Sequence, residues 1–456
     1  KAERKGENMT SDKNYRLEFT DKAKELVSQM TFEEKVQLIA GNCKIYQSMG
    51  IGSYNSVPYG AGGCERLDFP EMLFCDGPRG CVCGNSTCFP VTMARGATFD
   101  PELEERVGSA IGEEIRAHGG NFFGGVCINM PYNPGGGRSQ ETYGEDPYLS
   151  GRLGTAFVRA LQGSGEVMKA AACAKHFAVH SGPEAIRHSF NAEANPKDLW
   201  ETYLPAFETL VKDADVEAVM GAYNRTNGEA CCASKFLLED ILRGKWGFKG
   251  HVVSDCWAVK DFHENHMVTK NPRESAALAI EKGCDVNCGS TYLCLVQAYK
   301  EKLITKEQIR TAAVRLFTTR YLLGLFDGSE YDDIPFSVVE SKGHTALSKQ
   351  AAQKSMVLLK NDGLLPLDEK KLKSIAVIGP NANSRAALIG NYHGTASRYI
   401  TVSEGIQDYL EDTDVRVYYS EGCHLFKDRV EPLAKADDRV AEAVGIAKLS
   451  DVVVLC

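Results

Sequence analysis

An aspartate at the end of an apolar run is the first residue of this sequence that could carry chemistry. In GFKGHVVSDCWAV, residues 247–259, Asp255 follows the apolar pair Val252 and Val253 after a single serine. Burying a carboxylate is costly unless the group is paired or hydrogen-bonded. From this pattern alone, Asp255 is either a catalytic carboxylate or the N-cap of a following helix.

Other apolar runs also end in polar side chains. Lys175 and His176 close the run in CAKHF, and Asp76 follows the run in MLFCDGP. A Schiff-base lysine, as in barrel aldolases, is one functional interpretation of Lys175. The structural alternatives are a salt-bridged lysine, a hydrogen-bonded core histidine and a turn-forming Asp-Gly-Pro.

The elements that must position these residues alternate along the chain. Short apolar runs that end in polar or glycine-rich turns are separated by stretches of helical periodicity. Asp100 with Pro101, Asp146 with Pro147, and a Thr-x-x-Gln capping box at Thr305 predict the starts of three of these helices. The alternation predicts parallel strands covered by helices, with ligands bound at the strand ends of a (β/α) barrel or an open sheet.

Residues 324–344 interrupt this alternation. The segment is rich in Gly, Asp and Ser and shows no clear period, so it is predicted to be a linker. A second α/β domain follows, with a helix near 345–356 and a strand in SIAVIGP. Because the chain stops at Cys456, inside or just after a strand, we expect this second domain to be incomplete at its C-terminus.

The overall composition limits the partners. The 456 residues carry a net charge of −9 without a long basic run, which argues against nucleic acid and anionic membranes. No run of about 18 apolar residues is present, so no membrane span is expected. The first residues lack the apolar stretch of a signal peptide, which favours a cytoplasmic location, although a removed signal would leave secretion open.

The chain has 16 cysteines, most of them in apolar runs. Cys173, Cys284 and Cys288 are predicted to be packed thiols, and reduced cysteines in a reducing cytosol are the favoured interpretation. Residues 75–88 contain Cys75, Cys81, Cys83 and Cys88, but the Cys-x-Cys pair lacks the C-x2-C spacing of zinc sites. We therefore expect no metal and no cofactor.

The motifs taken together resemble family 3 glycoside hydrolases, the retaining β-glucosidase and β-xylosidase family. The order and spacing of seven segments carry the resemblance: DGPRG, GRSQETYGEDPYLSG, KHFAVH, MGAYNRTNGEACCAS, WGFKGHVVSDCWAV, LLKNDGLLPL and IAVIGPNAN. The resemblance implies a TIM-like barrel followed by an α/β sandwich.

The resemblance also assigns roles to the residues at the strand ends. It implies that Asp255 is the nucleophile, because a retaining glycosidase needs an ionised carboxylate to form a glycosyl-enzyme. Lys175, His176 and Asp76 are implied to bind sugar hydroxyls, which ammonium, imidazole and carboxylate groups can do together. Arg138, in GGGRSQE, matches another sugar-binding position.

Four further positions bear on the pocket and its specificity. Tyr223, in GAYN, is expected to touch the nucleophile or the sugar ring, with a buried packing role as the alternative. Trp257 is expected to contact substrate, although many β-glucosidases of the family carry tryptophan one position earlier, where this chain has Cys256. His188 lies after the Lys-His motif and is expected either at the pocket rim or at the surface.

A retaining mechanism also needs a general acid/base about 5–5.5 Å from the nucleophile. In β-glucosidases of the family this residue is a glutamate of the second domain, and no position of this chain matches it. We expect it from residues beyond Cys456 or from a homodimer partner, with His188 as a weak substitute.

The sequence thus predicts an α/β protein of four parts: an N-terminal extension at 1–20, a TIM-like catalytic barrel at 21–323, a linker at 324–344 and the beginning of an α/β sandwich at 345–456. The favoured function is that of an exo-acting retaining β-glucosidase acting on β-linked glucosides and short oligosaccharides, because DGPRG is typical of that branch. SDCWAV and GCDVNCG lean towards β-xylosidase. A dual enzyme and a carbohydrate-binding pseudoenzyme remain as alternatives.

Overall fold

The computed structural model describes residues 13–41, 56–180, 182–425 and 435–456. The chain forms two compact units, and we describe each by itself. The larger comprises Lys1–Met356 with Tyr392–Thr395, and the smaller comprises Val357–Asn391 with Ala396–Cys456.

The larger unit is built on a six-stranded sheet ordered β1-β2-β3-β4-β6-β9. Its strands are β1 (Tyr59–Ala61), β2 (Met72–Cys75), β3 (Phe122–Phe123), β4 (Ala171–Phe177), β6 (Ala218–Gly221) and β9 (His251–Ser254). The β1–β2 pair is antiparallel, and every later pair is parallel. A parallel bridge from Val253 to Val286 extends the pairing beyond β9. This half-barrel in chain order confirms the TIM-like α/β fold.

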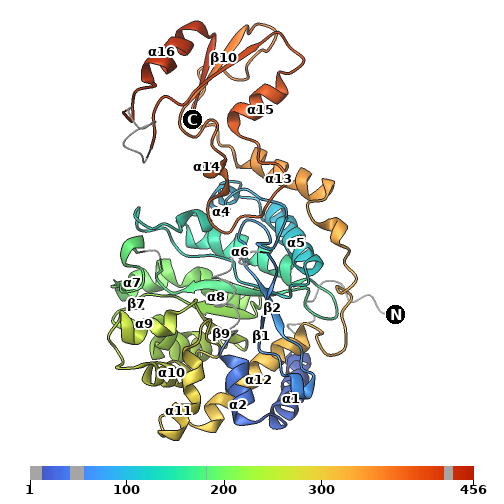
Figure 1. Ribbon diagram of the computed structural model, residues 1–456, viewed down its shortest axis with the longest axis vertical. Coiled ribbons are helices and arrows are strands. Elements are labelled where there is room, and N and C mark those ends of the chain that lie inside the picture. Colours follow the sequence, from blue (N-terminus) through green and yellow to red (C-terminus); the bar gives the residue numbers. More distant parts are fainter. Residues whose placement is uncertain (1–12, 42–55, 181, 426–434) are drawn as a thin grey trace. The chain divides into compact units, whose positions relative to one another are not determined.

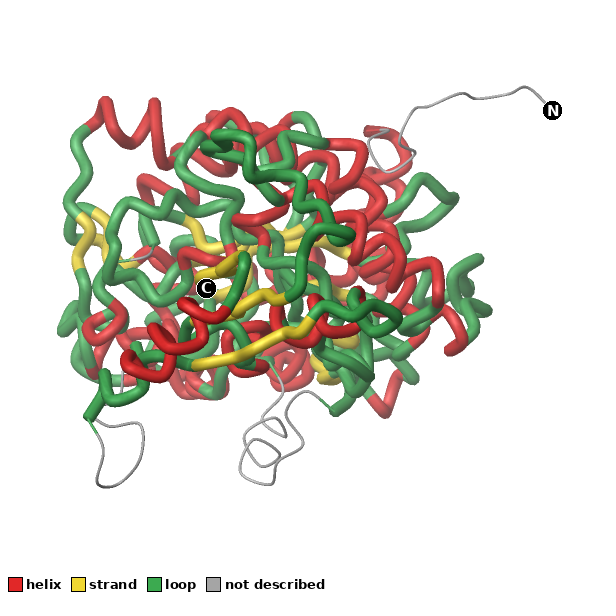
Figure 2. The backbone as a smooth tube through the Cα atoms, turned by 90° about the horizontal axis from the view of Figure 1, so that it is seen from above, coloured by secondary structure: helices red, strands yellow, loops and turns green. Residues whose placement is uncertain are grey.

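Helices separate these strands in the sequence, and long loops, green in Figure 2, join the short elements. The main helices are α1 (Lys13–Ser28), α2 (Phe32–Ile39), α5 (Pro101–Ala117), α6 (Pro147–Gln162), α8 (Pro205–Lys212), α9 (Ala258–Glu264), α10 (Pro272–Glu281), α12 (Lys306–Leu322) and α13 (Lys342–Ser355). Helices α1, α2 and α12 lie side by side in Figure 1.

The predicted helix starts at three positions are confirmed by their capping contacts. The Asp100 side chain accepts from the Leu103 N–H, and Asp146 accepts from the N–H groups of Tyr148 and Leu149. Both of the capping-box hydrogen bonds of Thr305 and Gln308 are present. These side chains satisfy N–H groups that have no partner within the helix.

The helical segment before β6 is interrupted. The structure has α7 (Pro196–Asp198), a π-helical segment at Leu199–Tyr203 and then α8. Pro205 lacks the N–H that a continuous helix would need, so the helix is re-started at this residue.

The smaller unit contains a three-stranded parallel sheet ordered β11-β10-β12. The strands are β10 (Ser374–Ile378), β11 (Arg416–Ser420) and β12 (Val452–Leu455), and the helices are α14 (Arg385–Ile389), α15 (Val402–Tyr409) and α16 (Val440–Leu449). All five residues of the central strand β10 are buried. This α/β arrangement agrees with the predicted second domain. Among the described residues, none of the helices combines the length and apolarity needed to cross a membrane.

The prediction that Cys288 is a packed reduced thiol is wrong. Cys256 and Cys288 form a disulfide, with their Cα atoms 4.5 Å apart. The parallel bridge between Val253 and Val286 brings the two following segments side by side, although 32 residues separate the cysteines in the sequence. The bridged pair also removes the basis for treating all the cysteines as reduced.

Candidate active site

Asp255 directly follows β9, and the two oxygens of its carboxylate have different surroundings. Oδ1 accepts a hydrogen bond from the Cys256 N–H at 2.8 Å. Oδ2 is buried, has no hydrogen-bond partner and lies 3.6 Å from Nε2 of His176. Burial raises the pKa of Asp255 above its usual value, and the positive charges of Arg138 and Lys175 offset only part of this shift. One oxygen is therefore held in place and the other is available for reaction.

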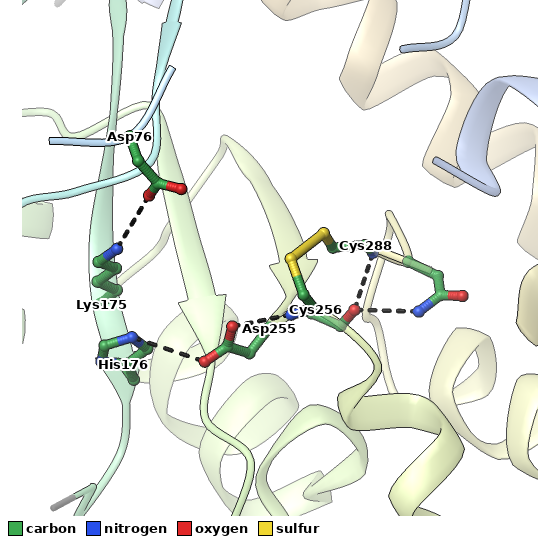
Figure 3. The surroundings of a disulfide bond; sticks show 8 residues. Asp76, Lys175, His176, Asp255, Cys256 and Cys288 are labelled. Carbon is green, nitrogen blue, oxygen red and sulfur yellow. Dashed lines mark hydrogen bonds and ion pairs between the residues drawn. A yellow bond between two sulfur atoms is a disulfide. The ribbon is translucent and has the colours of Figure 1, made fainter. Parts of the chain in front are cut away.

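Lys175 on β4 and the partly buried Asp76 after β2 form an ion pair across the intervening strand β3, with Nζ and Oδ1 3.3 Å apart. Figure 3 shows the two side chains pointing toward one another from β4 and from the end of β2. Burial lowers the pKa of Lys175, but the negative charges of Asp76 and Glu141 contribute to a net shift upward. A Schiff-base lysine must lose its proton, so the ion pair with Asp76 argues against the aldolase alternative.

His176 is held by one asparagine. The His176 N–H donates to Oδ1 of Asn129 at 2.7 Å, and Nδ2 of Asn129 donates to the His176 carbonyl at 2.8 Å. Nδ1 of the ring lies 3.2 Å from the same Asn129 oxygen, which can only accept. The ring proton is therefore assigned to Nδ1, and Nε2 is left as an acceptor beside Asp255. Burial holds the pKa of His176 well below its usual value, so the ring is neutral.

Arg138 forms the second cationic position of the pocket. It is buried and makes a two-pronged ion pair with Glu141, in which Nη2 lies 2.7 Å from Oε2. Its guanidinium carbon lies 5.0 Å from the ring centre of Tyr392, and Nζ of Lys175 lies 4.7 Å from the same centre. Tyr392 thus bridges two cations through contacts with the face of its ring.

Tyr392 and Glu141 are site residues that the sequence did not identify. Tyr392 belongs to the short segment Tyr392–Thr395, which is part of the larger unit although it is distant from it in the sequence. The negative charge of Asp76 raises the pKa of the Tyr392 phenol, as does burial. Glu141 lies three residues after Arg138, and this spacing is the only signal that could have revealed the pair.

The remaining predicted residues surround this centre. Tyr223 is buried, and its hydroxyl lowers the pKa of Asp255. The His188 ring packs edge-on against the Tyr223 ring at 4.5 Å, and its Nδ1 lies 2.8 Å from Oδ2 of Asp261 on α9. His188 is therefore one layer removed from the nucleophile. Trp257 is partly exposed, and its backbone N–H donates to the Cys288 carbonyl at 2.7 Å.

The disulfide lies directly beside the nucleophile, as Figure 3 shows. Cys256 supplies the N–H that holds Asp255, and the Cys288 N–H donates to Oγ of Ser254 at 3.0 Å. The bridge thus ties together the two segments that frame Asp255. It restricts how the backbone donor to the nucleophile can move.

The structure brings Asp76, Arg138, Lys175, His176, Tyr223 and Asp255 into one site. Several donors and acceptors here surround a carboxylate that has one unengaged oxygen. This set defines the class of the site: a cluster of polar side chains at the strand ends of an α/β barrel, whose groups can bind hydroxyls and support covalent carboxylate chemistry.

The chain belongs to glycosyl hydrolase family 3. Residues 55–319 match the glycosyl hydrolase family 3 N-terminal domain, and residues 356–456 match the corresponding C-terminal domain. A xylan 1,4-beta-xylosidase of Xylanibacter ruminicola is 35% identical over 451 residues, covering 94% of this chain and 50% of that protein. A probable exo-1,4-beta-xylosidase of Neosartorya fischeri is 39% identical over 398 residues, covering 83% of this chain and 50% of that protein.

Two solved structures show the same fold. The family 3 exo-beta-xylosidase XlnD, in complex with a xylobiose aziridine probe, has a TM-score of 0.85 at 30% identity, covering 99% of this chain and 58% of that one. A beta-glucosidase from Listeria innocua in complex with glucose has a TM-score of 0.80 at 28% identity, covering 96% of this chain and 63% of that one. The chain spans about half the length of the curated relatives that it matches.

Proposed function

We propose that this chain carries the nucleophile and the sugar-binding pocket of an exo-acting retaining β-glycosidase, with β-xylosides preferred as substrates. The carboxylate of Asp255, with one oxygen fixed and one unengaged, is the observation that carries the proposal. The xyloside preference rests on the names of the similar proteins and on the segments SDCWAV and GCDVNCG, by which the chain resembles the xylosidase branch.

In the first step, Oδ2 of Asp255 attacks the anomeric carbon, the glycosidic bond breaks, and a general acid protonates the departing oxygen. In the second step, water attacks the same carbon, the acid group now takes a proton as a base, and Asp255 is released. Lys175 and Asp76 would hold the sugar hydroxyls, and Nε2 of His176 would accept from another hydroxyl. We propose that the acid comes from residues beyond Cys456 or from a homodimer partner, because Asp76 and Glu141 are committed to buried cations.

Without its acid, the chain alone is expected to be slow on natural glycosides. General acid/base catalysis contributes about 10²–10⁴-fold. Aryl glycosides whose leaving groups need no protonation should be less impaired in the first step. Equal losses on aryl and alkyl glycosides would contradict this explanation.

A β-glucosidase is the second candidate, and Asp76 favours it. This aspartate lies in DGPRG, the motif by which the chain resembles the glucosidase branch, and its Oδ1 lies 3.3 Å from Nζ of Lys175. The two candidates differ in their response to the hydroxymethyl group that glucose has and xylose lacks. Comparing kcat/KM for aryl β-xyloside and aryl β-glucoside separates them.

Trapping tests the proposed chemistry directly. The protein would be incubated with 2-deoxy-2-fluoro derivatives of activated β-xylosides and β-glucosides, digested and analysed by mass spectrometry. A label on the peptide that contains Asp255 supports the covalent mechanism, and the faster-labelling sugar indicates the preference. Sugar binding without any label would instead support a carbohydrate-binding pseudoenzyme.

A further inference from the structure

A cluster of three buried cysteine thiols lies outside the proposed catalytic chemistry. Cys75 ends β2, and Cys81 and Cys83 lie in the loop that follows it. Their sulfur atoms all lie within 4.8 Å of one another, and those of Cys75 and Cys83 are 3.4 Å apart. The sequence argued against a metal among Cys75, Cys81, Cys83 and Cys88, because the Cys-x-Cys pair lacks the spacing of zinc sites. The structure brings the sulfur of Cys75 next to this pair.

The backbone of the loop brings the three sulfurs together. Gly77 has a φ of +139°, and a Cβ atom at this position would lie 1.7 Å from the Gly80 carbonyl oxygen. Only glycine permits so tight a turn. The Val82 N–H then donates to the Asp76 carbonyl at 3.0 Å, which folds the Cys81–Cys83 segment back onto the end of β2.

The distances between the sulfurs match those around a single metal ion. Thiolates bind zinc and similar ions at about 2.3 Å, so three of them around one ion lie about 3.8–4.0 Å apart. The separation of 3.4 Å between Cys75 and Cys83, and the limit of 4.8 Å within which all three sulfurs lie, are compatible with this value. Small side-chain rotations would therefore be enough to bring the sulfurs to an ion.

The surroundings favour a soft ion with three ligands. Cys75 and Cys81 are 0% exposed and Cys83 is 1% exposed, which leaves little access for a water ligand. Among the residues that the structure describes, no histidine, aspartate or glutamate joins the group. Zinc sites are almost always four-coordinate, whereas thiolates also select Cu(I), which needs no fourth ligand here.

We propose that Cys75, Cys81 and Cys83 form a three-coordinate thiolate site for a soft monovalent cation, Cu(I). The ion would join the end of β2 to the loop after it, so that the backbone on both sides of Asp76 is fixed. The proposal goes beyond the proposed glycosidase function and does not depend on it. It departs from the expectation of no metal that the sequence suggested.

A competition titration tests the site. Reduced, metal-free protein would be titrated anaerobically with the Cu(I) complex of bathocuproine disulfonate, whose loss of colour reports transfer of the ion. We expect one Cu(I) per chain, and Cys83→Ser should weaken binding by at least about 100-fold, since even outer-shell changes cost 10–100-fold. The matched control is Cys64→Ser, which removes a different buried free thiol and should leave binding unchanged.

A second measurement does not depend on the folding of any variant. Cu(I) should protect the three cysteines of the wild-type protein from alkylation, as mapped by mass spectrometry of the peptides that contain them. No transfer of Cu(I), an equal loss in Cys64→Ser, or preferential binding of Zn²⁺ would each overturn the proposal. A disulfide between Cys75 and Cys83 in the protein as isolated from reductant-containing buffer would overturn it as well.

Discussion

At the scale of single residues, the two oxygens of Asp255 separate positioning from reactivity. A backbone N–H holds one oxygen without adding a competing charge, and the other faces a neutral histidine. Burial disfavours the ionised form of the carboxylate and raises its pKa, and Arg138 and Lys175 offset part of this effect from nearby. The charge needed for attack is thus supported by cations that are themselves paired with Glu141 and Asp76.

Replacing Asp255 tests its role at this scale. In Asp255→Asn the side chain keeps its shape but loses the negative charge, so kcat on aryl glycosides should fall by about 10³-fold or more. The control is Asp261→Asn, which removes a partner of His188 one layer away and should cost less than about 10-fold. Asp255→Asn activity within tenfold of wild type would contradict the nucleophile assignment.

At the scale of elements, buried ion pairs fix the helices that surround the pocket. Arg95, on α4 (Thr92–Gly96), binds Glu104 of α5 with Nε 2.9 Å from Oε2, and the two side chains are 1% and 2% exposed. Nη1 of Arg95 also donates to the carbonyls of Pro78 and Pro90 at 2.9 and 3.0 Å. The pair therefore connects a helix to the loop that carries the thiol cluster.

Breaking this pair should destabilise the fold. Glu104→Ala leaves the buried Arg95 charge without its carboxylate, which costs about 3–5 kcal/mol of unfolding free energy. Glu102→Ala, on the exposed face of the same helix, should cost less than about 1 kcal/mol. Urea denaturation measures both, and equal effects for the two variants would show that the ion pair is not responsible.

A histidine on α13 adds a pH-dependent contact between elements. Nδ1 of His344 lies 2.9 Å from Glu114 and its Nε2 lies 3.4 Å from Glu113, both on α5. Burial lowers the pKa of His344, but these hydrogen bonds outweigh it and raise the pKa to about 9. The folded-state pKa therefore lies above the unfolded value of about 6.5.

The stability that His344 contributes should therefore depend on pH in one direction. It is fully present below about pH 6.5 and is lost as the pH rises through about 9. The difference in Tm between wild type and His344→Gln should accordingly shrink from about pH 6 to about pH 9.5. Lys342→Gln, an exposed change on the same helix, serves as the control. A difference that stays constant with pH would contradict the linkage.

At the scale of the whole molecule, the larger unit is not one continuous stretch of sequence. The first stretch of this unit ends at Met356, yet residues 392–395 also belong to the unit. They bring Tyr392 over Lys175 and Arg138. A pocket residue is thus supplied from a part of the chain that lies after the first strand of the smaller unit. Removal of everything after Met356 would remove this residue as well.

Substitutions of Tyr392 test this contribution. Each cation–π contact is worth about 0.5–2 kcal/mol, so Tyr392→Ala should lower kcat/KM for aryl glycosides by about 10-fold. Tyr392→Phe keeps the aromatic face and should retain most of the activity. If both variants lost activity to the same extent, the hydroxyl rather than the ring face would be the important group.

The sequence by itself determined the polar residues at the strand ends, the helix caps at Asp100, Asp146 and Thr305, and the α/β fold. These features depend on local periodicity and on hydrogen bonds within a few residues, which a sequence displays directly. Tertiary structure alone decided that Tyr392 faces Lys175, that Cys256 joins Cys288, and that Cys75 meets the Cys81–Cys83 pair. Such contacts depend on how loops fold back and on which strand ends become neighbours. No local pattern encodes these distances.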